Sequence, residues 1–133
     1  MMDRGNELDE CIDRLFAAGD LVVTDDVELE LVRQRRSLAA LDAKATRGTA
    51  TSRYLATYDG LMRVVEIACV HRGYRFGSHP HRAMKAIVLA ACDDSNVDAA
   101  VSHRHDVKKT GAPVDEATFQ LLERLRGSFD LRA

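Results

Sequence analysis

The amino-acid sequence predicts an all-α fold, and two features carry this prediction. The chain has only two prolines in 133 residues, so few positions are barred from a helix interior. Its large apolar residues recur at steps of three and four over most of its length, which is the spacing of one face of an α-helix. We therefore expect a single domain, 1–133, built as an antiparallel bundle of four main helices with additional short helices.

The stretch 50–72 is predicted to be the central helix. Its apolar side is formed by Tyr54, Tyr58, Leu61, Met62, Val65 and Cys69. Thr51 or Ser52 can cap its start, and Gly73 can adopt the left-handed conformation that ends it. Asp59 and Arg63 are four residues apart, so we expect an ion pair within the helix.

Two helices are expected before this stretch. The first, at 7–18, has Leu8, Ile12, Leu15 and Phe16 on one face and ends at Gly19. The apolar residues 21–23 form a short extended link, too short for a sheet of its own. The second helix begins at a Thr24 or Asp25 cap and runs to about Lys44. Its apolar stripe is Val27, Leu31, Leu38 and Leu41, and its other sides carry the basic cluster Arg33, Arg35 and Arg36.

Three helices are expected after the central one. Residues 73–83 form a loop, and Pro80 suits the first turn of a helix with Met84, Ile87, Val88, Ala91 and Cys92 on its core side. The polar residues 93–96 end that helix. The next runs from about Val97 to Gly111, and the last begins near Asp115 with Phe119, Leu122, Leu125 and Phe129 facing inward.

Composition excludes several classes of protein. The net charge is −2, so general basic character does not indicate nucleic-acid binding. Cys11, Cys69 and Cys92 are far apart and odd in number, which favours buried thiols in a reducing cytosol. The first ten residues are acidic and lack the apolar segment of a signal peptide, and no apolar run is long enough to span a membrane. We expect a cytoplasmic protein without a cofactor.

The segment SHRHDVKK at 102–109 is the main candidate for chemistry. On a helix, Arg104 and Lys108 share one face, and His105 and Lys109 share the next. One interpretation is a solvated helix end, where the helix dipole favours cations. The other is a phosphate or RNA contact site in which His105 transfers a proton. Neither Arg104 nor His105 lies in an apolar stripe, so we expect alanine at either position to change stability by less than about 0.5 kcal/mol.

The sequence TYDGLMRVVEIACVHRGYR at 57–75 resembles the central helix of small prokaryotic HEPN-domain proteins. The features that carry the resemblance are Tyr58-Asp59, Arg63, Gly73-Tyr74-Arg75, the histidine-bearing segment 79–82, and Arg104-His105-Asp106. Their order and spacing extend the likeness from about Leu8 to Leu125. The resemblance implies a HEPN-like bundle, in which Asp59 and Arg63 lie near the Arg104 motif and position it.

The resemblance also implies a function and its residues. Arg104 would bind the scissile phosphate of RNA, His105 or His103 would move protons, and Asp106 would hold an imidazole. Lys108, Lys109, Arg63 and Asp59 would contact the substrate. The protein would act as a metal-independent endoribonuclease of a toxin–antitoxin or phage-defence system. It would form a homodimer, because HEPN sites are typically composed across a two-fold interface, with a cognate antitoxin or nucleotidyltransferase as partner.

One departure from the family pattern supports an alternative. Ribonuclease members carry a histidine four to six residues after the arginine. Here that histidine is missing, because the residues after Arg104-His105-Asp106 are Val107, Lys108, Lys109, Thr110 and Gly111. The chain would then be a catalytically degenerate HEPN scaffold that serves as a protein-interaction module. A weaker hypothesis is a zinc site formed by His79, His81, His103 and His105. It lacks a cysteine or acidic partner at ligand-like spacing, so we expect no metal.

Overall fold

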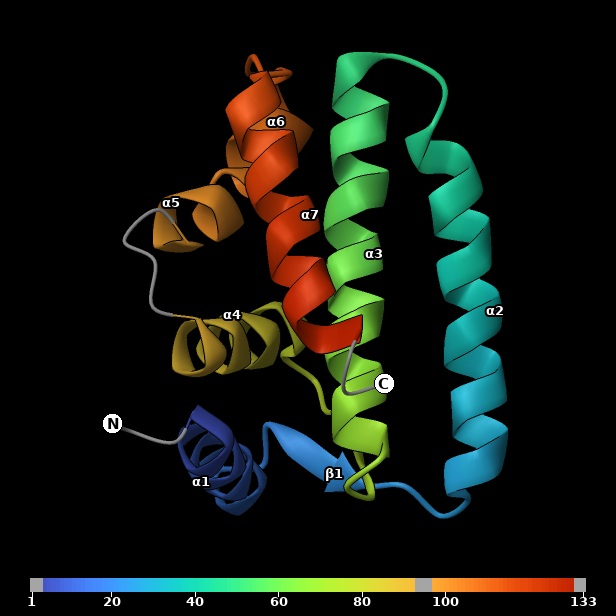
Figure 1. The fold of residues 1–133 in the computed structure, drawn as a ribbon, viewed down its shortest axis with the longest axis vertical. Helices are drawn as coiled ribbons and strands as arrows, with labels where there is room; N and C mark the ends of the chain where they lie inside the picture. Colours follow the sequence, from blue (N-terminus) through green and yellow to red (C-terminus); the bar gives the residue numbers. More distant parts are fainter. Residues whose placement is uncertain (1–3, 93–96, 131–133) are drawn as a thin grey trace.

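The computed structural model describes residues 4–92 and 97–130, and in them the all-α prediction is confirmed apart from one small sheet (Figure 1). The elements in order are α1 (Arg4–Ala17), β1 (Leu21–Val23), α2 (Val27–Ala45), α3 (Ala50–Val70), β2 (Tyr74–Phe76), α4 (Pro80–Ala91), α5 (Val97–Ser102), α6 (Arg104–Thr110) and α7 (Glu116–Asp130). The expected helix break at 93–96 lies outside the described residues.

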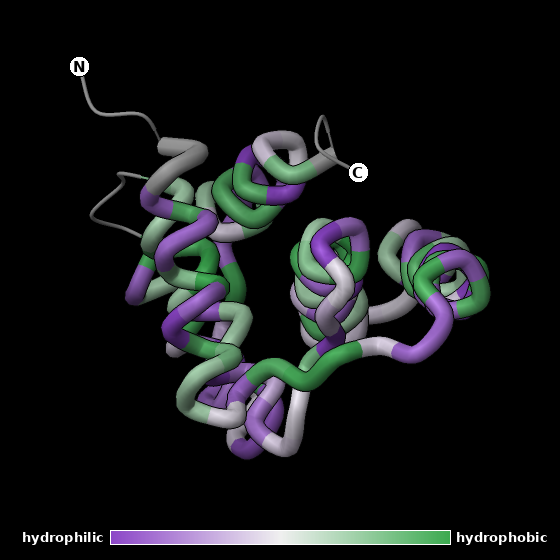
Figure 2. Tube along the Cα trace, turned by 90° about the horizontal axis from the view of Figure 1, so that it is seen from below, coloured by the Kyte–Doolittle hydropathy of each residue, from purple (hydrophilic) through white to green (hydrophobic). Residues whose placement is uncertain are grey.

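Helix α3 is the centre of the molecule. Viewed along the long axis, it lies between α2 on one side and the other helices on the other (Figure 2). All six residues of its predicted apolar side are buried, and they join one continuous core with residues of α1, α4, α5, α6 and α7. A helix that contacts neighbours on almost every side can position polar groups on several faces.

The helices packed against α3 do not all run antiparallel to it. Leu31, early in α2, packs with Val70 at the end of α3, so this pair is antiparallel as predicted. In α7, by contrast, Phe119 packs against Tyr54 early in α3, and Arg126 lies beside Gly60 further along. The contacts therefore move toward the end of α7 as they move toward the end of α3, so the two helices run in the same direction. Helices α1 and α4 pack on each other and lie beside the lower half of α3, where Figure 1 shows them nearly end-on.

The short sheet was not expected. Residues 21–23 are extended as predicted, but they pair antiparallel with 74–76, a segment predicted to be loop. Phe16, predicted to face the core, is 42% exposed. Its ring instead lies 4.9 Å from that of Tyr74, so it covers the end of the sheet rather than filling the bundle.

Several predicted helix ends are confirmed and others are shifted. Pro80 opens α4, and Gly73 and Gly111 have the positive φ of left-handed residues, 88° and 64°. The caps differ by one or two residues from those expected. The Asp26 carboxylate accepts the Leu29 N–H at 3.1 Å, and the Thr49 hydroxyl accepts the Ser52 N–H at 3.1 Å. These side chains each satisfy an N–H that the first turn leaves without a helical acceptor.

The helix predicted over 97–111 is divided at His103 into α5 and α6. The buried Tyr54 hydroxyl donates to the Ala100 carbonyl at 3.0 Å. That carbonyl is the acceptor that an uninterrupted helix would offer to the Arg104 N–H. The hydroxyl of a core tyrosine therefore bonds to this carbonyl at the place where α5 ends and α6 begins.

Three further observations complete the fold. Among the described residues, no helix combines the length and apolar character needed to cross a membrane. Cys11 and Cys69 are buried, and Cys92 is partly buried. Burial raises the pKa of the Cys69 thiol to about 12, with Glu66 adding to the effect. This thiol is therefore protonated at neutral pH, as in a structural rather than a reactive cysteine.

Candidate functional site

A pocket of about 300 Å³ opens where α3, α4, α5 and α6 meet. Its lining is mostly cationic or aromatic and consists of Tyr58, His81, Val101, Ser102, Arg104, His105, Lys108 and Lys109. The chain as a whole carries a net charge of −2, so this concentration of cations is a local feature. We call these eight residues the Arg104 pocket.

Arg104 is the most constrained cation of the pocket. Its side chain is 18% exposed, and its guanidinium carbon lies 5.2 Å from the centre of the Tyr58 ring, within the range of a cation–π contact. One terminal nitrogen, Nη2, donates to the Asp59 carboxylate at 3.3 Å. Because Tyr58 and Asp59 are adjacent on α3, one turn of the central helix fixes the position of this guanidinium.

The Nε atom of Arg104 is buried and has no hydrogen-bond partner among residues 4–92 and 97–130. Within the described part of the chain, it is the single buried side-chain nitrogen or oxygen in this condition. An unsatisfied buried donor costs roughly 1–3 kcal/mol, more when it is charged. Among the described residues, the domain thus satisfies its other buried side-chain polar atoms but keeps one costly donor on an arginine that lines the cationic pocket.

Tyr58 and His81 form the second polar contact of the pocket. The Tyr58 hydroxyl lies 3.4 Å from His81 Nδ1, and the ring centres are 5.8 Å apart. Burial raises the pKa of Tyr58 to about 12, against a lowering by Arg104. Burial also lowers the pKa of His81, and Arg104 adds to this lowering. At neutral pH the contact therefore joins a neutral phenol to a neutral imidazole.

The predicted site residues fall into two groups. Arg104, His105, Lys108 and Lys109 lie together in the pocket, and Asp59 contacts Arg104 from beside it. Three others lie elsewhere: His103, Asp106 and Arg63. Since Arg104 is partly buried on Tyr58, alanine there removes packing as well as charge. We therefore revise the expectation of unchanged stability for Arg104 and keep it for the exposed His105.

His103 and Asp106 do not face the pocket with Arg104. The Nε2 atom of His103 lies 3.2 Å from the Pro113 carbonyl oxygen, and its ring meets Tyr54 edge-on at 6.1 Å. His103 thus holds the α6–α7 connection against the core. Asp106 is exposed, and no hydrogen bond or ion pair among the described residues joins its carboxylate to an imidazole.

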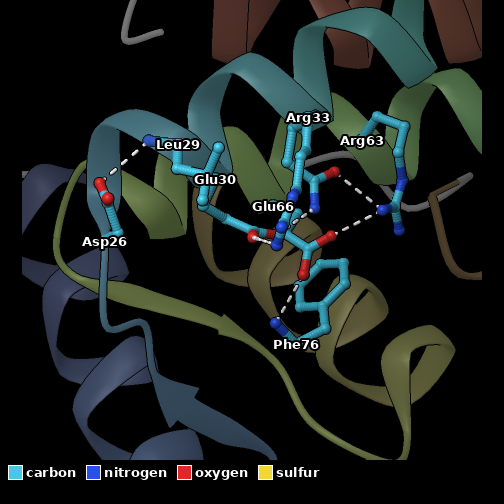
Figure 3. Close-up of polar contacts among 8 residues, drawn as sticks. Asp26, Leu29, Glu30, Arg33, Arg63, Glu66 and Phe76 are labelled. Carbon is cyan, nitrogen blue, oxygen red and sulfur yellow. Dashed lines mark hydrogen bonds and ion pairs between the residues drawn. The ribbon is translucent and has the colours of Figure 1, made fainter.

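Arg63 belongs to a different cluster on the α2 side of α3 (Figure 3). Its Nη1 lies 2.8 Å from Gln34 Oε1 and 2.8 Å from Glu66 Oε1. The other Glu66 oxygen accepts the Phe76 N–H at 2.7 Å, and Gln34 donates to Glu30 at 2.9 Å. The predicted Asp59–Arg63 ion pair is therefore wrong: Arg63 pairs with Glu66, and Asp59 pairs with Arg104.

Two other predictions concern metal and the basic cluster of α2. The described residues contain no group of three or more histidine, cysteine or acidic side chains arranged to hold a metal ion. His81 and His105 line the Arg104 pocket, whereas His103 contacts Pro113. The cluster Arg33, Arg35 and Arg36 is exposed as predicted.

Sequence reasoning named Tyr58 only as a feature of the resemblance and His81 only as a possible zinc ligand, and it did not place either residue in a site with Arg104. A signal for Tyr58 exists in the sequence, because a tyrosine within an apolar stripe carries a hydroxyl that needs a partner when buried. The partner, His81, lies 23 residues away on α4. Spacing along the chain cannot identify such a contact, since it depends on how α4 packs on α3.

Comparisons of this chain with protein-family models, with curated proteins and with solved structures found no significant match.

Proposed function

We propose that this protein binds RNA through its phosphate backbone at the Arg104 pocket. The observation that carries the proposal is the guanidinium of Arg104, which Tyr58 and Asp59 hold in place while its buried Nε lacks a partner among the described residues. Buried polar groups without a hydrogen-bond partner in the folded protein are characteristic of functional sites. At such a site the ligand, rather than the protein, supplies the missing hydrogen bond.

The neighbouring cations support a polyanionic ligand. Lys108 lies one helical turn beyond Arg104 on α6, and Lys109 and His105 line the same pocket. A planar guanidinium can bind two phosphate oxygens at once, and lysines supply mobile charges beside it. A row of cations along one short helix suits successive phosphates of a strand better than a single small anion.

The resemblance to HEPN-domain proteins makes RNA the phosphate ligand that we propose. Under this proposal the domain is a HEPN-like scaffold that forms a homodimer and works with a cognate antitoxin or nucleotidyltransferase. A dimer would bring two Arg104 pockets into one assembly. Light scattering tests this part separately, since a monomer at micromolar concentration would contradict it.

RNA cleavage is the second candidate function, and the position of His105 favours it. A metal-independent ribonuclease needs an imidazole or equivalent group beside the scissile phosphate to transfer a proton. His105 lines the pocket with Arg104, whereas His103 and Asp106 do not contribute to it. A protein that binds RNA without cutting it would be the catalytically degenerate form of the scaffold.

The binding proposal is tested by fluorescence anisotropy with a short single-stranded RNA. Arg104→Lys keeps the charge but loses the planar fork, so we expect affinity to fall by about tenfold or more. The control is Lys44→Ala, which removes an exposed cation that lies in the last turn of α2 and does not line the Arg104 pocket. Wild-type protein without measurable affinity at low salt would overturn the proposal.

The cleavage candidate is tested on the same RNA by gel electrophoresis without added metal. If His105 transfers a proton, His105→Ala should slow cleavage by roughly 10²–10⁴-fold while binding persists. RNA that stays intact with bound wild-type protein would exclude cleavage and leave the binding proposal standing.

A further inference from the structure

The buried hydroxyl of Tyr58 makes a contact that can determine where the neighbouring His81 carries its proton. Tyr58 is 1% exposed, so water does not satisfy its O–H group. Among the described residues, this hydroxyl has one hydrogen-bond partner, His81 Nδ1, at 3.4 Å. The distance is long for a hydrogen bond of this kind, as is common in sites that tighten when a ligand binds.

The proton positions follow from this geometry. A buried phenol needs an acceptor for its O–H, and the Nδ1 lone pair is the acceptor within reach. A neutral imidazole has one acceptor nitrogen and one donor nitrogen. When Nδ1 accepts, the proton of the ring therefore lies on Nε2, because the hydrogen bond at one nitrogen fixes the tautomer of the other.

We propose that Tyr58 holds His81 in its Nε2–H tautomer, so that this neutral imidazole donates a hydrogen bond to a phosphate oxygen of the RNA bound beside Arg104. The proposal rests on the function proposed above. It makes His81 a phosphate-binding residue and Tyr58 a positioning residue that acts through it. Tyr58 then positions both residues that would bind the phosphate. Its ring supports Arg104, and its hydroxyl orients His81.

The charges around His81 agree with a neutral donor. From α6, Arg104 and Lys108 disfavour a proton on the ring, and His105 lines the same pocket. From α3, Asp59 alone opposes them, and burial is the largest cause of the lowered pKa of His81. On α4 itself, Lys85 is paired with Asp98 at 2.6 Å and Arg82 with Asp20 at 2.5 Å.

Side-chain nitrogen NMR tests the tautomer in the RNA-free protein. Two-bond correlations from ring carbon protons of His81 distinguish a protonated Nε2 from a protonated Nδ1. We expect the Nε2–H form in wild type at pH 7.5. In Tyr58→Phe, which keeps the aromatic ring beneath Arg104, we expect the preference to weaken. A protonated Nδ1 in wild type would overturn the proposal without touching RNA binding.

A pair of variants tests the hydrogen bond to phosphate. Glutamine reaches the position of Nε2 and can donate there, whereas asparagine reaches only the position of Nδ1. We expect His81→Asn to weaken RNA binding by about tenfold, and His81→Gln to weaken it by less than about threefold. Equal losses in the two variants would overturn the proposal. A wild-type protein that does not bind RNA would instead refute the proposed function, and the NMR result would still decide the tautomer.

Discussion

The two sides of α3 carry charged clusters of similar composition that are completed in different ways. Toward α2, the Arg63 guanidinium meets Glu66 and Gln34, and the second Glu66 oxygen accepts a backbone N–H from β2 (Figure 3). Toward α6, the Arg104 guanidinium meets Asp59 and the Tyr58 ring, and its Nε has no partner in the described part of the chain. The protein thus supplies hydrogen-bond partners for the Arg63 cluster, whereas the Arg104 cluster keeps one donor without a partner among the described residues.

The difference separates structural charge from functional charge. Glu66 is 4% exposed, and such a buried carboxylate is tolerated only when it is paired and hydrogen-bonded. The Arg63 cluster meets this condition and joins α2, α3 and β2. The Arg104 cluster leaves one buried donor without a partner among the described residues, although its α3 members, Tyr58 and Asp59, lie only about one turn from Arg63. We therefore expect the first to govern stability and the second to govern ligand binding.

Replacing Arg63 should have the largest effect on stability. Arg63→Met leaves the buried Glu66 carboxylate without its cation, and breaking such a pair typically costs about 3–5 kcal/mol. Guanidinium-chloride denaturation measures this loss. Affinity for RNA, measured on the folded variant, should stay within about twofold, because Arg63 does not line the pocket. A cost below about 1 kcal/mol would show that the α2 cluster is not structural.

Arg104→Met is the matched change on the other side of α3. Methionine fills the space over Tyr58 and removes the unsatisfied Nε, and replacing a polar group in this way is often neutral. Asp59 keeps its contact with water, since its side chain is 36% exposed. We expect a change in unfolding free energy within about 1 kcal/mol and a loss of RNA affinity of about tenfold or more. Strong destabilisation would make Arg104 a structural residue like Arg63.

The pH dependence of stability should show a smaller effect that belongs to the α6 side. Because burial lowers the folded pKa of His81 below the ordinary histidine value of 6.5, the unfolded chain binds more protons between these two values. Stability is therefore expected to fall as pH decreases from about 6.5 toward the folded pKa, and this loss ceases below both values. Denaturation of wild type and His81→Asn at pH 7.5 and 5.5 isolates the contribution. An identical pH dependence in both proteins would contradict the lowered pKa.

The sequence predicted the helices better than their arrangement. The spacing of apolar residues identified α3 and its buried face, because residues three or four apart lie on the same side of any α-helix. It could not give the direction of α7 relative to α3, or the pairing of 21–23 with 74–76, because both depend on contacts between distant segments. The division of the 97–111 helix likewise coincides with a contact between distant segments, in which the Tyr54 hydroxyl on α3 donates to the Ala100 carbonyl.

The candidate site was predicted in part for the same reason. Arg104, His105, Lys108 and Lys109 are close in sequence, so a short helix brings them together whatever the fold. Asp59 and Arg63 are also close in sequence, yet they point to opposite neighbours and pair with different partners. Tyr58 and His81 meet only through the packing of α4 on α3, which no spacing rule contains.

Arginine side-chain NMR tests the contrast between the two sides of α3 most directly. The Nε–H signals of Arg63 and Arg104 would be followed in one sample while a short single-stranded RNA is added to saturation. We predict that the Arg104 signal shifts as its side chain gains a phosphate partner, and that the Arg63 signal stays in place. An Arg104 signal that does not move while RNA binds, or an Arg63 signal that moves as far, would contradict the assignment of the Arg104 pocket as the RNA site.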